Sequence, residues 1–147
     1  MKRLKKYVNY INESEWYRGH TTNTKEVDFI WMSSDETQAK TYSKMNSIIQ
    51  GGDALLSSYD IDLTKLNVLD LSSYDMNDRM TDNELEGFLK ELEIDYEYES
   101  LFDFSEYDIP LSRLVNNITD EIMNIYDVLL IKEDDIDTIL IKYFFTK

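Results

Sequence analysis

An arginine, two serines and a group of late acids are the side chains of this chain best suited to binding or catalysis. Arg18 stands between Tyr17 and Gly19, and Ser33 and Ser34 follow a short apolar run. A guanidinium binds phosphate oxygens through two parallel hydrogen bonds, and a carboxylate stabilises positive charge that develops on a substrate. These groups can act together only where the fold brings them into one cavity. The acids stand near the end of the chain and are Glu133, Asp135 and Asp137.

The residues that the chain lacks exclude several common sites. With no cysteine, it has no disulfide, no thiol nucleophile and no cysteine-ligated zinc. The single histidine, His20, excludes multi-histidine metal sites, and no nucleophile elbow accompanies it for a serine-histidine-aspartate triad. No glycine-rich phosphate motif is present, and the acidic stretch 95–99 lacks the glycine of a calcium loop. We therefore expect no metal centre.

The composition indicates one acidic globular domain. The chain has 147 residues, 42% of them hydrophobic, and it carries 15 basic and 30 acidic residues for a net charge of -15. No apolar stretch approaches the ~18 residues that a membrane span needs. Nucleic-acid binding requires a basic face, which this charge disfavours. We therefore predict no membrane association, no direct nucleic-acid binding, and a basic protein as the target.

The first half of the domain contains one strong helix signal. Asp35 and Gln38 form a capping-box pattern, and the helix that they open ends at the Gly51-Gly52 pair. Its apolar residues recur at helical spacing on one side, which we expect to face the core. They are Ala39, Tyr42, Met45 and Ile49.

Two further helices and six strands complete the expected domain. Thr81 and Glu84 form a second capping box, and Pro110 opens a helix with an apolar stripe from Leu111 to Ile122. Residues 95–108 predict a loop or a strand. Strands near both ends with helices between them indicate an α+β domain. The strands are expected at 15–19, 27–32, 58–63, 67–71, 126–132 and 137–145, the last two as a hairpin or as adjacent strands.

Residues 1–13 form a tail that differs from the domain at 14–147. Four of the first six residues are basic and none is acidic, whereas the rest of the chain holds all 30 acids. Leu4, Val8 and Ile11 recur at helical spacing, so the tail is expected to be a short amphipathic helix or an ordinary solvated one.

The order of motifs over residues 16–145 resembles the ADP-ribosyltransferase-like family of the arginine–serine–glutamate type. Members carry an arginine on the first core strand, often in Y-R-G, as at Tyr17-Arg18-Gly19. A strand that ends in hydroxyls before a helix follows, as in the run F-I-W-M-S-S-D and the A-x-x-Y helix here. An acidic motif then opens a late strand. The resemblance implies a split β-sheet core with flanking helices, and NAD as the donor of ADP-ribose.

The resemblance also implies roles for the matching residues. Arg18, within its Y-R-G motif, would bind the phosphates or ribose of NAD. Ser33 or Ser34 would contact the nicotinamide ribose and orient the catalytic acid. Tyr17 and Tyr42 would line the nicotinamide pocket by stacking. The structural alternatives are a surface ion pair for the arginine, a helix cap for the serines and core packing for the tyrosines.

The acids depart from the family's pattern. Asp137 takes the place of the catalytic glutamate, with Asp135 as the upstream acid that polarises an arginine acceptor. Departure of nicotinamide leaves a cationic ribose, which a nearby carboxylate stabilises. Aspartate is one methylene shorter than glutamate, and a displacement of ~1 Å can cost ~100-fold in rate. Weak activity, catalysis by Glu133 instead, and an inactive relative therefore all stay open, as does a plain solvated turn.

The tail is similar to the capsid-targeting peptides of internal head proteins in large tailed phages. Those peptides are basic and amphipathic, and they are cleaved after a hydrophobic-x-Glu sequence, which Ile11-Asn12-Glu13 matches. The resemblance implies a phage protein that is packaged in the virion head, injected with the DNA and active in the host cytoplasm.

Two functions from different classes follow. The first is a small phage-type mono-ADP-ribosyltransferase that transfers ADP-ribose from NAD to a host macromolecule. The alternative is a non-enzymatic acidic protein, either an inactive transferase fold or a polyanion mimic, that binds or inhibits a basic or nucleic-acid-binding host protein. Consumption of NAD separates the two.

Overall fold

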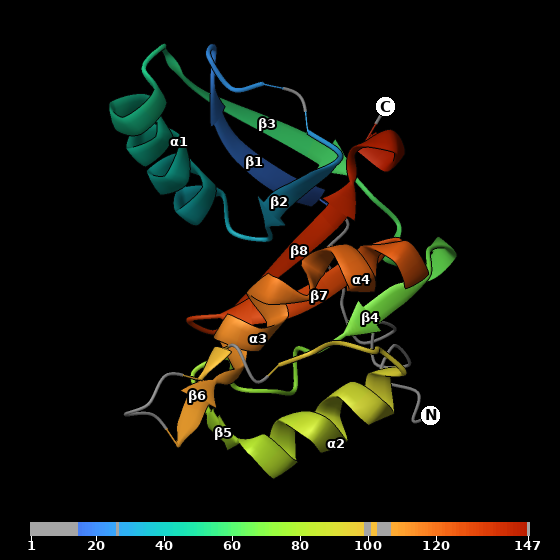
Figure 1. Cartoon of the computed structure of the whole chain (residues 1–147). Coiled ribbons are helices and arrows are strands. Elements are labelled where there is room, and N and C mark those ends of the chain that lie inside the picture. Colours follow the sequence, from blue (N-terminus) through green and yellow to red (C-terminus); the bar gives the residue numbers. More distant parts are fainter. Residues whose placement is uncertain (1–14, 26, 99–100, 103–106, 147) are drawn as a thin grey trace.

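The strands that carry the arginine, the serines and the acids lie next to one another in one sheet (Figure 1). The computed structural model describes residues 15–25, 27–98, 101–102 and 107–146. Within them, a mixed sheet of six strands and four α-helices form an α+β fold, which confirms the predicted α+β class and no more specific fold. The predicted tail at 1–13 and its cleavage site lie outside the described residues.

The sheet has the strand order β3-β1-β2-β8-β7-β4. Neighbouring strands with a resolved register run antiparallel, except that β4 and β7 run parallel. The predicted hairpin near the C-terminus is confirmed as the pair β7–β8. The bounds are β1 Glu15–Thr21, β2 Phe29–Ser33, β3 Ala54–Asp60, β4 Val68–Asp70, β7 Val128–Glu133 and β8 Ile136–Lys142.

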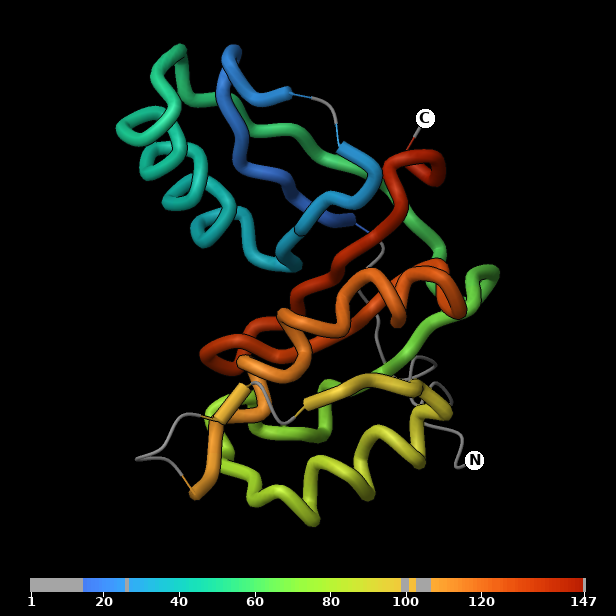
Figure 2. The backbone as a smooth tube through the Cα atoms, viewed as in Figure 1, coloured from blue at the N-terminus to red at the C-terminus, as the bar shows by residue number. Residues whose placement is uncertain are grey.

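The helices lie at two ends of the sheet. In Figures 1 and 2, α1 lies beside β1 and β3 at one end, whereas α2, α3 and α4 lie near β7 and β4 at the other. The single helix predicted from Leu111 to Ile122 is two helices, because Ile118 has φ -106° and ψ 16° and interrupts the hydrogen-bond pattern. The bounds are α1 Glu36–Gln50, α2 Asp82–Leu92, α3 Leu111–Asn117 and α4 Thr119–Ile125.

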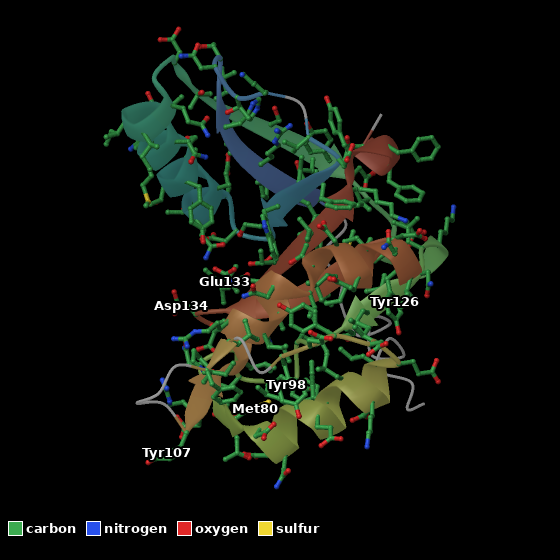
Figure 3. All side chains as sticks on the ribbon, in the orientation of Figure 1. Met80, Tyr98, Tyr107, Tyr126, Glu133 and Asp134 are labelled. Carbon is green, nitrogen blue, oxygen red and sulfur yellow. The ribbon has the colours of Figure 1, made fainter. Side chains whose placement is uncertain are left out.

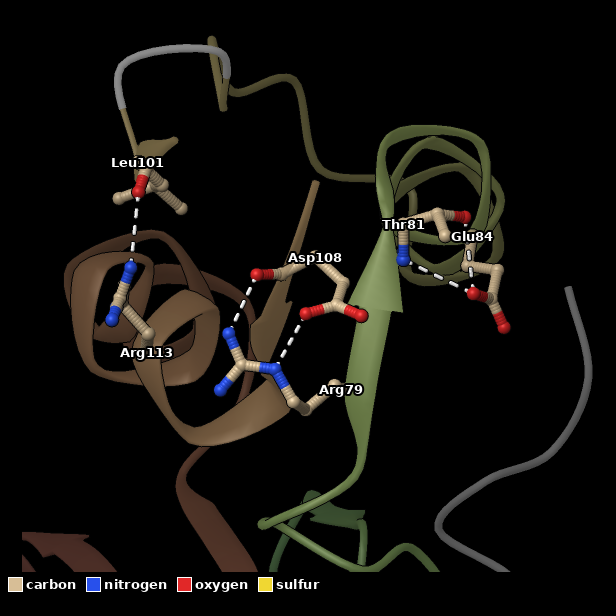
Figure 4. Close-up of polar contacts among 6 residues, drawn as sticks. All are labelled: Arg79, Thr81, Glu84, Leu101, Asp108 and Arg113. Atoms are coloured by element: carbon tan, nitrogen blue, oxygen red, sulfur yellow. Dashed lines mark hydrogen bonds and ion pairs between the residues drawn. The ribbon is translucent and has the colours of Figure 1, made fainter. Parts of the chain in front are cut away.

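A small two-stranded sheet, which the sequence analysis did not predict, brings the start of α2 next to the start of α3. It pairs β5 (Arg79–Thr81) with β6 (Asp108–Pro110). The guanidinium of Arg79 donates to the side chain and the carbonyl of Asp108 (Figure 4). The predicted capping box at Thr81 is confirmed, with the Thr81 backbone N–H donating to the Glu84 carboxylate at 3.0 Å.

Each face of the sheet carries its own hydrophobic core. Leu129 and Leu140 belong to the core under α2, α3 and α4, and their strand neighbours Leu130 and Ile139 belong to the other core. Trp16, fully buried, completes this second core from β1. Because β7 and β8 are buried on both faces, their sequences are apolar runs without alternation.

The predicted inner face of α1 is wrong for three of its four residues. Ala39 is buried, but the side chains of Tyr42, Met45 and Ile49 are 38%, 50% and 76% exposed. Ala39 instead shares the buried side with Ser43, and both lie against Gly19 of β1. Small residues on both elements let the helix approach the strand closely, so the larger apolar side chains of α1 point outward.

In the described part of the chain, no helix combines the length and the apolar character that crossing a membrane requires.

Candidate functional site

A cavity of about 940 Å³ lies between the two halves of the fold. Residues of β1, β2 and α1 form one wall, and the β7–β8 turn, α3 and the loop at 73–77 form the other. This volume lies within the range of small-molecule sites and suits a ligand of nucleotide size.

The structure brings six of the nine predicted site residues to this cavity and places three elsewhere. The six come from both walls and include two acids of the β7–β8 turn. They are Tyr17, Gly19, Ser33, Tyr42, Glu133 and Asp135. The residues that do not line the cavity are Arg18, Ser34 and Asp137.

Strand alternation explains this division. Tyr17 pairs with Ser33, and Ser33 pairs with Thr138, so these three residues form a row across β1, β2 and β8 that lines the cavity. Successive side chains on a strand point to opposite faces. Arg18 and Asp137, each one residue from this row, therefore belong to the opposite face of the sheet.

Arg18 has its own contact on that opposite face. Its guanidinium carbon lies 5.8 Å from the centre of the Tyr143 ring, in the geometry of a cation–π contact. The arginine that the sequence analysis assigned to the phosphates of NAD is thus directed away from the cavity. A nucleotide in the cavity would therefore be bound by side chains other than Arg18.

Replacing Arg18 tests this placement. Arg18→Ala is expected to keep any nicotinamide release from NAD within about threefold of the wild type, because the guanidinium does not reach the cavity. Lys65→Ala, which removes a well-exposed cation, is the matched control. A loss of about 100-fold in Arg18→Ala alone, with the fold intact by circular dichroism, would show that Arg18 contacts the substrate after all.

Ser33 ties the end of β2 to the start of α1. Its hydroxyl accepts a hydrogen bond from the Asp35 backbone N–H at 3.0 Å and donates one to the Gln38 side chain at 2.6 Å. Asp35 caps the helix as predicted, accepting from the Gln38 backbone N–H at 3.0 Å. A hydroxyl oxygen has two lone pairs, so Ser33 keeps one acceptor site for a ligand in the cavity.

Tyr42 and Glu133 join the two walls. The Tyr42 hydroxyl donates to the Glu133 carboxylate at 3.2 Å. Burial raises the pKa of the Tyr42 hydroxyl, and the charges of Glu133 and Asp134 raise it further. The phenol therefore stays protonated at neutral pH and can hold the carboxylate in place. Figure 3 shows Glu133 and Asp134 at the tip of the β7–β8 hairpin.

The turn of this hairpin has aspartate at its second position, where glycine is preferred. Glu133 pairs with Ile136, which leaves Asp134 and Asp135 as a two-residue turn with φ of 49° and 64°. Two positive φ values define a type I′ turn, for which Asn-Gly is the preferred sequence. Strain of this kind, kept at the mouth of a cavity, is a common feature of functional sites.

Relieving the turn should stabilise the protein. Asp134→Asn combined with Asp135→Gly is expected to raise the free energy of unfolding by about 1 kcal/mol, measured by urea denaturation. Asp53→Asn with Asp60→Asn, two exposed acids outside the turn, controls for the loss of charge. An unchanged or lower free energy in the turn variant alone would contradict the strain.

The carboxylate of Asp137 forms an ion pair outside the cavity. Its carboxylate lies 3.8 Å from the Lys132 ammonium on the neighbouring strand, and its side chain is 14% exposed. Of the three candidate acids, Glu133 and Asp135 therefore remain in position to act on a ligand in the cavity.

Several cavity residues were missed by the sequence analysis. Trp31 and Thr138 lie on the same strand faces as Ser33, so strict alternation from Ser33 would have found Trp31. No sequence signal marked the neutral polar residues contributed by α1, α3 and the loop at 73–77. They include Asn46, Asn77 and Asn116.

Among the described charged residues that line the cavity, acids outnumber bases. Asp75, Glu133, Asp134 and Asp135 face one cation, Lys132, among the described lining residues. A cleft lined by one sign of charge concentrates ligands of the other sign. The mouth near the hairpin therefore favours cationic groups. Within the described residues, no group of three or more histidines, aspartates or glutamates is placed to hold a metal ion.

Comparisons of the chain with models of protein families, with curated proteins and with solved structures found no match.

Proposed function

We propose that the protein is a mono-ADP-ribosyltransferase that cleaves NAD in this cavity and transfers ADP-ribose to a macromolecule. The observation that carries the proposal is the adjacency of β1, β2 and β8 beside a nucleotide-sized cavity. On this proposal, the six-stranded sheet corresponds to the split sheet of the family that the sequence resembles. Tyr17, Ser33 and the acids of the hairpin then share one site.

Different lining residues contact different parts of NAD in this proposal. Trp31 and Tyr42 offer aromatic faces for the nicotinamide ring, which is cationic in NAD and is attracted by the acidic mouth. Ser33 accepts a hydrogen bond from a ribose hydroxyl. None of the described lining residues is an arginine, and the Lys132 ammonium pairs with Asp137 outside the cavity, so the diphosphate is left to neutral amide donors. These donors are Asn46, Asn77 and Asn116.

The reaction needs a carboxylate near the ribose. The bond between C1′ and the nicotinamide nitrogen breaks with its electron pair moving to nicotinamide, and C1′ becomes cationic. Glu133, held by Tyr42, stabilises this charge until the acceptor attacks C1′ and gives up a proton. The role assigned from sequence to Asp137 thus passes to Glu133.

Release of nicotinamide is the direct test. Purified full-length chain is incubated with NAD, alone and with bacterial lysate, and nicotinamide is measured by chromatography while radiolabelled NAD reports transfer to protein. We expect release in both samples and label on protein only with lysate. Intact NAD in every sample would overturn the proposal.

A non-enzymatic function is the second candidate, and the acidic lining of the cavity favours it. A protein of net charge -15 can bind a basic protein without consuming NAD. This candidate predicts that binding weakens steeply with salt, because exposed charges are screened over about 10 Å at 0.1 M ionic strength. Salt-dependent binding of a basic protein such as lysozyme, with NAD left intact, would favour it over the transferase.

A further inference from the structure

The outer side of α1 carries an apolar surface that no described residue covers. Met45, Ile48 and Ile49 are 50%, 86% and 76% exposed, and together they form what we call the α1 stripe. Single exposed apolar side chains are ordinary, whereas a contiguous group marks a surface for interaction.

The α1 stripe begins at the cavity. Tyr42 and Asn46 of α1 line the cavity, while Ala39 and Ser43 turn toward β1. At about 100° per residue, Ile49 and Met45 follow Tyr42 around the helix on the side away from β1, and Ile48 lies beyond them. Ile49 lies about 10 Å along the helix axis from Tyr42, at 1.5 Å per residue. The stripe therefore leads from the mouth of the cavity outward.

The charge at the mouth determines what can lie across it. Glu133, Asp134 and Asp135 meet α1 there, through the hydrogen bond from Tyr42 to Glu133. A cationic side chain is the complement of these acids, and apolar side chains are the complement of the stripe. A polypeptide that carries both, about 10 Å apart, fits this surface.

We propose that the α1 stripe docks the acceptor protein, a polypeptide whose arginine or lysine enters the acidic mouth while neighbouring apolar side chains cover Met45, Ile48 and Ile49. This inference rests on the proposed transferase function for calling the partner an acceptor. The docking itself depends only on the stripe and on the acids of the hairpin.

Two fluorescent peptides test the docking by anisotropy. One carries a single arginine followed, about three extended residues or 10 Å later, by three leucines, and its match carries serines in place of the leucines. We expect the wild-type protein to bind the leucine peptide more tightly. Ile48→Ser with Ile49→Ser should weaken that binding about tenfold without changing the charge of the protein.

A matched variant on α2 controls for surface substitution. Asn83→Ser with Gly87→Ser changes two exposed helical positions, and it should bind both peptides as the wild type does. Equal binding of the two peptides by the wild type, or unchanged binding of the leucine peptide by the Ile48/Ile49 variant, would overturn the docking surface.

Nicotinamide release, measured without any peptide, keeps the two proposals apart. The Ile48/Ile49 variant should release nicotinamide at the wild-type rate, because neither residue lines the cavity. Stripe-dependent peptide binding together with intact NAD would support the docking surface and overturn the transferase function. Nicotinamide release without stripe-dependent binding would do the reverse.

Discussion

Glutamine at position 133 should lower the rate of nicotinamide release from NAD by about 100-fold or more. Glu133→Gln keeps the size of the side chain and an oxygen that can accept the hydrogen bond from Tyr42. It removes the negative charge that is to stabilise the cationic ribose. The initial rate at saturating NAD, measured by chromatography, reports this loss, and thermal unfolding verifies that the variant is folded.

Asp137→Asn is the matched control, because it makes the same chemical change outside the cavity. Asp137 pairs with Lys132 and does not line the cavity, so its amide should keep the rate within about threefold of the wild type. The reverse result, with full activity in Glu133→Gln and a large loss in Asp137→Asn, would return the catalytic role to Asp137 as the family resemblance implies.

Elements with local signals were predictable from the sequence. Asp35 and Thr81 begin their helices as expected, because a side-chain cap acts on backbone groups two or three residues away. The apolar runs of β7 and β8 likewise identified the hairpin. The orientation of α1 was not predictable, because it depends on contact with Gly19, which lies on a different element.

Which of the predicted site residues line the cavity depends on the pairing of strands that are far apart in the sequence. A Y-R-G motif states that Tyr17, Arg18 and Gly19 are adjacent, but it does not state which of them faces a ligand. A shift of one residue moves every side chain of a strand to the other face, and the pairing of Tyr17 with Ser33 fixes that register here. The motif therefore located the strand without locating the guanidinium.

The same reasoning applies to the acids. Five consecutive residues, 133–137, contain four acids, and the tip of the hairpin determines which of them reach the cavity. An Asn-Gly pair would have marked the tip in the sequence. Asp134 and Asp135 occupy that place instead, so the sequence alone did not show that Glu133 lines the cavity and Asp137 does not.

Of the four possible glycine-to-alanine substitutions, Gly19→Ala should destabilise the protein most. A Cβ at Gly19 would collide with the carbonyl oxygen of Ala39 and lie 2.7 Å from the backbone nitrogen of Ser43. Both are backbone atoms of α1, so no side chain can move aside and the helix must shift. We expect the free energy of unfolding to fall by about 3 kcal/mol or more.

Gly87→Ala separates this clash from the general effect of replacing glycine. Gly87 lies within α2, and a Cβ there meets no atom within 4 Å. Alanine should raise the free energy of unfolding by about 0.5–1 kcal/mol, because glycine is a poor helix residue. Urea denaturation of both variants measures the difference.

Since α1 carries Tyr42 and its hydrogen bond to Glu133, a shifted helix in a still-folded Gly19→Ala should also slow nicotinamide release, whereas Gly87→Ala should not. Equal stability of the two variants would mean that α1 does not pack on β1 through Gly19, and the wall of the cavity that α1 forms would have to be placed differently.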